Sequence, residues 1–377
     1  MARKAFRIGT HRVRHPEQTW ELIAPLLADY GVTRVADITG LDVLGVPVVM
    51  AVRPLGRTLA VSQGKGQTLL LAKLSAVMES MEFWHAEFHH PPLSYRELPA
   101  SELDLPYGIT QLAAGPDALV TDCTPLDWVD AVGLCGGGRV PVPARIVTLP
   151  EDQRSWVPPG LQWSSNGLAA GNSLAEATLH ALYEVIERDA VSRRDLTAIQ
   201  YVDPASITEP HCADLIARIA AGGATLRITH LPSRFAVPCF GATVWGPDFP
   251  VSCLGWGAHL DAGVAVSRAV TEAVQARLTA IAGSRDDLPP IYHQARTGTQ
   301  EPRPAEGSPL SWADVESIGP GAFDDLAEEL AWVSAKVVDV IGVEPVRVDL
   351  STVEEFAVVK VLAPNTAFDR EKVHPVR

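Results

Sequence analysis

The sequence contains few cysteines, and their spacing argues against two common kinds of site. Five cysteines are spread over 377 residues, and no two of them are spaced as Cys-x-x-Cys. An odd number of unclustered cysteines indicates neither a disulfide framework nor a zinc site.

Long apolar runs and an excess of positive charge are also missing. No apolar run approaches the roughly 20 residues of a membrane-spanning helix, and the basic N-terminus, Met1–Arg7, lacks the apolar stretch of a signal peptide. Acidic residues outnumber basic ones by 45 to 31, which gives a formal net charge of −14 and argues against a general nucleic-acid surface. We therefore expect a cytoplasmic protein whose partners include neither nucleic acid nor membrane.

What the sequence does contain is a predicted helix with several carboxylates, within Trp163–Asp189. Ser173 is an N-cap candidate, and Glu176 follows it at capping-box spacing. At about 100° per residue, Glu176, Glu184 and Glu187 fall within an arc of roughly 80°. Such carboxylates repel one another unless a cation lies among them. For this segment alone, a capping glutamate with a solvated acidic face remains an alternative.

Two further predicted helices carry polar groups at positions i, i+4 and i+7, which share one helix face. The first runs from Gln67 to about Phe88 and the second follows Gly257; their polar groups are Ser75, Glu79 and Glu82, and Arg268, Glu272 and Gln275. An i, i+4 Arg–Glu pair is also common as a weak surface ion pair.

A lysine between two glycines precedes the first of these helices. Ser62–Gly66 lacks the spacing of a Walker A loop, so Lys65 is either an anion ligand or an exposed turn residue. Oxygen-only clusters suit hard divalent ions that keep part of their coordination for phosphate, and lysine and arginine suit phosphate oxygens. Together these residues predict a magnesium–nucleotide site without a P-loop.

In these segments the sequence resembles the YcaO family, over about residues 10–363. The matching motifs are Ser62–Gly66, Ser75/Glu79/Glu82, Asn172/Glu176/Glu184/Glu187/Arg188 and Arg268/Glu272/Gln275. The resemblance implies an α+β fold, with mixed and antiparallel sheets packed against long helices that carry the ATP and Mg²⁺ site. It also implies one YcaO-like region over 1–377, without a fused leader-binding domain.

The resemblance assigns roles residue by residue. It implies ATP binding by Lys65, Ser75, Asn172, Glu184, Arg188, Arg268 and Gln275, and Mg²⁺ binding by Glu79, Glu82, Glu176, Glu187 and Glu272. His259 and Arg285–Asp287 also fit the family pattern, without an assigned role.

The implied activity is ATP-dependent activation of a peptide backbone amide, in a ribosomally made precursor peptide. Attack by a side chain gives an azoline, attack by the N-terminal amine gives a macrocyclic amidine, and external sulfide gives a thioamide. We expect a stand-alone cyclodehydratase, similar to bottromycin-type members, that forms a thiazoline or an amidine. Thioamide formation with a TfuA-like partner and a non-catalytic nucleotide-binding role remain alternatives, as does a homodimer.

The C-terminal tail departs from the azoline-forming pattern. Its proline-alternating sequence is missing, and Pro364-Asn365-Thr366 stands where Pro-Gly-Leu is often found. We expect the short tail, 364–377, to approach the site with less preorganisation.

The remaining pattern predicts a series of helices and strands. Helices are expected at 16–30, 213–221 and 323–340, and strands at 34–38, 46–53, 58–61, 128–134, 139–149, 225–230, 239–245, 251–256, 346–350 and 356–362. Segment 91–122 is expected to be an irregular connection, and 288–321 a linker or mobile loop.

Overall fold

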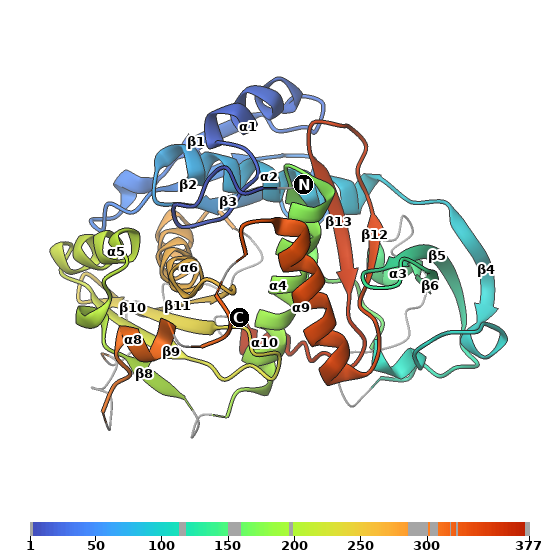
Figure 1. The fold of residues 1–377 in the computed structure, drawn as a ribbon. Coiled ribbons are helices and arrows are strands. Elements are labelled where there is room, and N and C mark those ends of the chain that lie inside the picture. Colours follow the sequence, from blue (N-terminus) through green and yellow to red (C-terminus); the bar gives the residue numbers. More distant parts are fainter. Residues whose placement is uncertain are drawn as a thin grey trace.

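The protein is described here by a computed structural model covering residues 3–112, 118–149, 160–195, 199–285, 301, 308–316, 318–321 and 323–373. Over these residues the strands form three antiparallel sheets, and long helices lie between them (Figure 1). The predicted α+β class with antiparallel sheets and long helices is confirmed. Within this part of the chain, no helix has the length and apolar character needed to cross a bilayer.

The first sheet carries the helix nearest to it in sequence. Its order is β1-β2-β3, with β1 (Arg34–Asp37), β2 (Val48–Val52) and β3 (Val61–Lys65). Helix α2 (Leu69–Phe88) packs on β2 and β3, and α1 (Pro16–Ile23) packs on α2. Thr68 caps α2 by accepting the N–H of Leu71.

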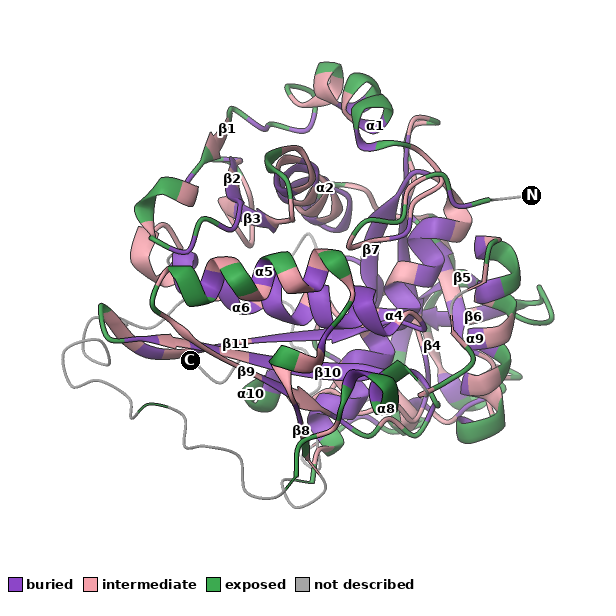
Figure 2. Cartoon of the chain, turned by 60° about the vertical axis from the view of Figure 1, so that its left-hand side comes forward, coloured by how far each residue is buried: buried purple, intermediate pink, exposed green. Residues whose placement is uncertain are grey.

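The second sheet supports the helix that follows its last strand. Its order is β11-β10-β9-β8, with β8 (Gln200–Val202), β9 (Thr225–His230), β10 (Cys239–Gly246) and β11 (Phe249–Ala258). Helix α6 (Ala262–Ala282) lies along β10 and β11, and α5 (Pro210–Ala221) lies on α6. Figure 2 shows α6 largely buried, whereas α5 keeps an exposed face.

The third sheet combines strands from distant parts of the sequence. Its order is β4-β5-β12-β13-β7, with β6 beside β5; the strands are β4 (Leu93–Pro99), β5 (Pro125–Gly133), β6 (Arg139–Pro143), β7 (Leu168–Gly171), β12 (Val346–Asp349) and β13 (Ala357–Leu362). Helix α4 (Leu174–Arg193) packs on β7 and β13, and α9 (Leu326–Ile341) packs on α4. The short helices are α3 (Ala144–Val147), α8 (Trp312–Glu316) and α10 (Arg370–Val373).

Glycines on the strands let the three long helices α2, α4 and α6 lie unusually close to their sheets. A Cβ added to Gly64 on β3 would overlap the backbone of Ala72 and Ala76 on α2. One added to Gly171 on β7 would lie 2.5 Å from the backbone nitrogen of Ala177 on α4. Gly255 on β11 meets the backbone of α6 in the same way. Side chains one turn along these helices are thereby held in fixed positions beside the strands.

Several predicted boundaries were wrong. The strand expected at 58–61 is β3, which runs to Lys65, so this lysine lies on a strand and not on a turn. Segment 91–122 contains β4, whose Glu97 has φ of 47° and interrupts the pairing register. The helix expected at 16–30 ends at Ile23 and continues as a 3-10 turn, because Pro25 cannot continue the α-helical hydrogen bonds.

Other segments were missed or only partly described. The strand expected at 139–149 ends at Pro143 and gives way to α3, and β7 and β8 were not predicted. Helix α8 lies within the expected linker at 288–321, most of which falls outside the described residues. Asp286 and Asp287, which fit the family pattern, also fall outside them.

We predict that Gly64→Ala destabilises the fold by more than about 3 kcal/mol, because the new methyl group meets backbone atoms that cannot move aside. Chemical denaturation measures the change. Gly138→Ala is the matched control, since a Cβ there has no neighbour within 4 Å. Equal stability of the two variants would contradict the packing argument.

Candidate functional site

A cavity of about 790 Å³ lies where α2, α4 and α6 face one another. Its walls contain every residue assigned to ATP or Mg²⁺ from the sequence: Lys65, Ser75, Glu79, Glu82, Asn172, Glu176, Glu184, Glu187, Arg188, Arg268, Glu272 and Gln275. The three helices thus present their polar faces to one space. The individual roles of these residues remain predictions.

Backbone N–H groups orient three of the carboxylates. Glu79 accepts the N–H of Gln63 at 2.8 Å, and Glu82 accepts that of Ala170 at 2.6 Å. Glu184 accepts the N–H of Gly167 at 3.2 Å. Each donor belongs to a strand or loop of a neighbouring sheet, so the sheets set the direction of the carboxylates.

Both oxygens of Glu176 already accept hydrogen bonds. Oε1 accepts the backbone and side-chain N–H groups of Asn172 at 3.1 and 2.9 Å. Oε2 accepts the N–H of Val13 at 2.8 Å, and the Arg12 guanidinium lies 3.6 Å from Oε1. The structure therefore gives Glu176 a part in holding the N-terminal segment, while its role as an Mg²⁺ ligand stays a prediction.

The cations of the cavity are only partly matched by carboxylates. Lys65 Nζ lies 2.5 Å from Glu272, and Arg188 lies 3.1 Å from Glu187. Arg268 Nη1 lies 2.9 Å from Nδ1 of His180, and its buried Nε makes no hydrogen bond within the described residues. A buried guanidinium with an unused donor in a cavity wall suits a phosphate oxygen.

Burial raises the pKa of Glu79, Glu187 and, most strongly, Glu82. Nearby carboxylates add to the increase at Glu82, where Glu79 and Glu184 contribute repulsion. Burial also lowers the pKa of Arg268 and His180. Carboxylates in this condition gain most from a divalent cation, which compensates their charge and displaces their protons.

No group of three or more His, Cys, Asp or Glu side chains in the described ranges is arranged as a metal site. Mg²⁺ is commonly held by one or two carboxylates together with substrate phosphates, and the paired carboxylates and arginines of the cavity fit that mode.

Arg12 and His180 are among the cavity-wall side chains that sequence reasoning missed. His180 lies four residues after Glu176 and four before Glu184, so the shared helix face was a usable signal. No sequence pattern marks Arg12, which reaches the cavity only through long-range folding.

Lys360 was also missed, and it holds a loop that lines the cavity. It is 1% exposed on β13, and its ammonium donates to the carbonyls of Ser164 and Asn166, each at 2.6 Å. Ser164–Asn166 line the cavity. Burial lowers the pKa of Lys360 to about 7. A lysine in the apolar run Val358–Leu362 was the signal available in the sequence.

The C-terminal tail reaches the cavity as expected, with Phe368, Arg370 and Val373 in the wall. Asp189, at the end of α4, fixes it by accepting the N–H of Ala367 at 2.7 Å. Residues 374–377 fall outside the described part of the chain.

Comparison with known proteins agrees with this geometry. A family model described as YcaO cyclodehydratase, binding ATP and Mg²⁺, matches residues 63–367. An uncharacterized Mycobacterium tuberculosis protein is 39% identical over 375 residues, covering 96% of this chain and 83% of that protein. A second uncharacterized protein, from the tfuA 3′ region of Rhizobium leguminosarum bv. trifolii, is 38% identical over 298 residues, covering 74% of this chain and 69% of its own.

A solved structure shares the fold. YcaO from Methanopyrus kandleri, bound with AMPPCP and Mg²⁺, matches with a TM-score of 0.74 at 23% identity, covering 100% of this chain and 98% of that one. The predicted family resemblance and the cofactors ATP and Mg²⁺ are confirmed.

We predict that stability depends on pH through Lys360. The folded state lowers the pKa of Lys360 from 10.5 to about 7, so between these values the unfolded chain binds the extra proton. Stability should therefore rise with pH across this window, by up to about 1.4 kcal/mol per unit from this group. Denaturation of wild type and Lys360→Met from pH 7 to 10 isolates the effect, and parallel curves would contradict it.

Proposed function

Because this chain belongs to the YcaO family, we propose that it uses ATP to activate a backbone amide of a ribosomally made peptide by O-phosphorylation. The observation that carries the proposal is the cavity in which all residues assigned to ATP or Mg²⁺ meet, with a buried guanidinium donor of Arg268 left unused within the described residues. That arrangement suits a polyphosphate with its metal ion better than an uncharged ligand.

In this proposal the carboxylates and the cations of the cavity have different roles. When bound, Mg-ATP supplies the phosphoryl group that turns the amide oxygen into a leaving group. The carboxylates available to the metal are Glu79, Glu82, Glu187 and Glu272, and one or two of them would hold a metal ion together with phosphate oxygens. Lys65, Arg188 and Arg268 would neutralise phosphate oxygens. The loop at Ser164–Asn166 and the tail at Phe368 line the same cavity.

The nucleophile decides the product, and we favour an intramolecular one. A tethered side chain or N-terminal amine has a high effective molarity, so attack within the peptide is the easier chemistry. The product is then a thiazoline or a macrocyclic amidine, formed with loss of one water.

Thioamide formation is the second candidate. It is favoured by the Rhizobium leguminosarum bv. trifolii relative, which is described by its place in the tfuA 3′ region. In that case external sulfide is the nucleophile and a separate TfuA-like protein is the partner. A non-catalytic nucleotide-binding role remains a further alternative.

We predict that Glu187→Gln abolishes Mg-ATP binding while the protein stays folded, because the change removes a charge and a metal ligand together. The same result is expected for Glu184→Gln. Isothermal calorimetry measures binding, and circular dichroism checks the fold. Glu328→Gln, on the exposed face of α9, is the matched control. Wild-type affinity in Glu187→Gln would remove this residue from the site.

We also predict that turnover requires peptide and releases ADP and phosphate. With ¹⁸O in the target amide, the label should appear in phosphate, and the mass of the peptide should fall by one water without added sulfide or partner. Acetylation of the peptide N-terminus then separates amidine from azoline.

Three other outcomes would redirect the proposal. AMP with pyrophosphate would mean adenylation of the substrate. Replacement of the amide oxygen by sulfur, only with sulfide and a partner present, would establish the thioamide route. Mg-ATP binding without peptide-dependent turnover under either condition would favour the accessory role.

A further inference from the structure

A second buried polar cluster lies at the N-terminal arm, which comprises residues 3–15. Its central residues are Lys4, His11, His259 and Glu329. The arm folds back on itself, with Ala5 and Phe6 donating to the carbonyl of Arg12. Its middle residues, Ile8–Thr10, and Arg12 and Arg14 line the cavity. The arm lies outside the residues that the family model matches.

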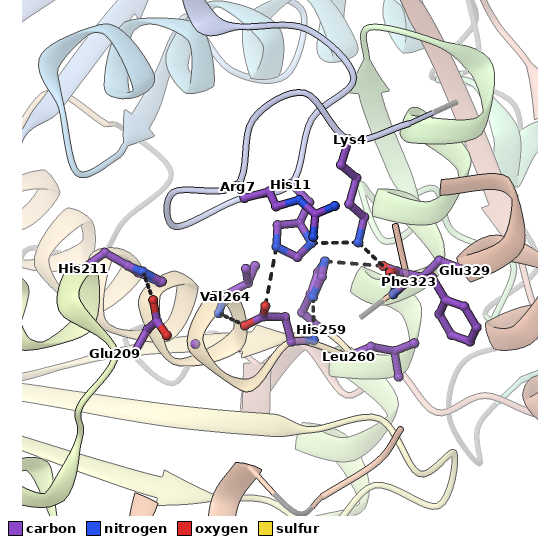
Figure 3. Close-up of polar contacts among 12 residues, drawn as sticks. Lys4, Arg7, His11, Glu209, His211, His259, Leu260, Val264, Phe323 and Glu329 are labelled. Carbon is purple, nitrogen blue, oxygen red and sulfur yellow. Dashed lines mark hydrogen bonds and ion pairs between the residues drawn. The ribbon is translucent and has the colours of Figure 1, made fainter. Parts of the chain in front are cut away.

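An ion pair without solvent contact anchors the arm. Lys4 Nζ lies 2.7 Å from Glu329 Oε2, and the side chains of both residues are 0% exposed. Glu329 also accepts the N–H of Phe323 at 2.9 Å, and both residues are shown in Figure 3. It accepts the hydroxyl of Tyr183 at 2.8 Å as well. A buried pair is stable only with such additional hydrogen bonds, because desolvation of both charges is costly.

Two histidines complete the cluster, and their contacts keep both rings neutral. His11 Nδ1 accepts from the Lys4 ammonium at 2.8 Å, which leaves its Nε2–H directed at Asp261, 3.5 Å away. His259 Nδ1 accepts the N–H of Asp261 at 2.9 Å, and its Nε2 lies 3.6 Å from Glu329 (Figure 3). Burial lowers the pKa of both histidines, to about 4 at His11.

The cluster connects the arm to α4 and α6, which line the cavity, and to α9. Lys4 and His11 belong to the arm, Tyr183 to α4 and Glu329 to α9, while Asp261 caps α6 by accepting the N–H of Val264 at 3.1 Å. Directly after His11, Arg12 and the N–H of Val13 contact Glu176 in the cavity. The position of these two contacts therefore depends on how the arm is anchored.

We propose that Lys4, His11, His259 and Glu329 are positioning residues, which fix the N-terminal arm so that Arg12 and Val13 hold Glu176 in its place for Mg-ATP. The inference rests on the proposed nucleotide site. According to this inference, the arm contributes to nucleotide binding. The four residues that control the affinity do not themselves line the cavity.

The test removes the anchor without leaving a buried charge. Single changes at Lys4 or Glu329 would strand the other charge, whereas Lys4→Met with Glu329→Gln keeps the volumes and the acceptor for Tyr183. We expect this double variant to melt close to wild type, to bind Mg-ATP about tenfold or more weakly by calorimetry, and to be cleaved faster by trypsin within the arm. Arg7→Ala is the control, because its ion pair with Asp324 is solvent-exposed.

A second pair of variants keeps the test decisive if the double variant does not fold. His11→Asn retains an acceptor for the Lys4 ammonium, and His11→Ala removes it. Weaker Mg-ATP binding in His11→Ala, with recovery in His11→Asn at equal melting temperature, supports the inference. Wild-type affinity in His11→Ala, and in the double variant where that folds, overturns it. Failure of the wild type to bind Mg-ATP overturns the proposed function itself, which distinguishes the two results.

Discussion

The cavity depends on direct contact between helix backbone and strand backbone at three places. Gly64, Gly171 and Gly255 provide the space for α2, α4 and α6 respectively. Because the helices lie so close, backbone N–H groups of neighbouring strands and loops reach the carboxylates at Glu79, Glu82 and Glu184. A side chain in place of the hydrogen would move each helix outward and lengthen these bonds. The close packing of the helices and the orientation of the carboxylates thus both depend on these glycines.

The charges of the cavity are poorly balanced in the protein alone. Burial disfavours the ionised form of Glu82 and Glu79, and it also disfavours the charge of Arg268. Two ion pairs, Lys65–Glu272 and Arg188–Glu187, offset only part of this cost. A ligand that carries both a metal ion and phosphates offers a cation to the carboxylates and anions to Arg268. Binding such a ligand would therefore recover free energy that the protein alone loses by burying these charges.

The sequence predicted the parts of this site that depend on local periodicity. Spacing of i, i+4 and i+7 places Ser75, Glu79 and Glu82 on one face whatever the rest of the chain does, and the capping position of Ser173 fixes the start of α4. Parts that depend on contacts between distant segments could not be predicted. Lys65 was placed on a turn because nothing local shows that β3 pairs with β2 up to that residue. The anchoring of the arm likewise needs Glu329, which no neighbouring residue indicates.

The ion pair of Lys4 and Glu329 joins residues separated by 325 positions in the chain. During synthesis at about 5–20 residues per second, Lys4 therefore waits tens of seconds for its partner. The wall formed by Phe368 and Arg370 emerges later still. Helices α2 and α6 can form and pack on their sheets before this wall is complete, whereas α4 also needs β13 (Ala357–Leu362) as part of its support. A nascent chain would thus contain its carboxylate helices before the segment around Phe368 and Arg370 completes the cavity wall.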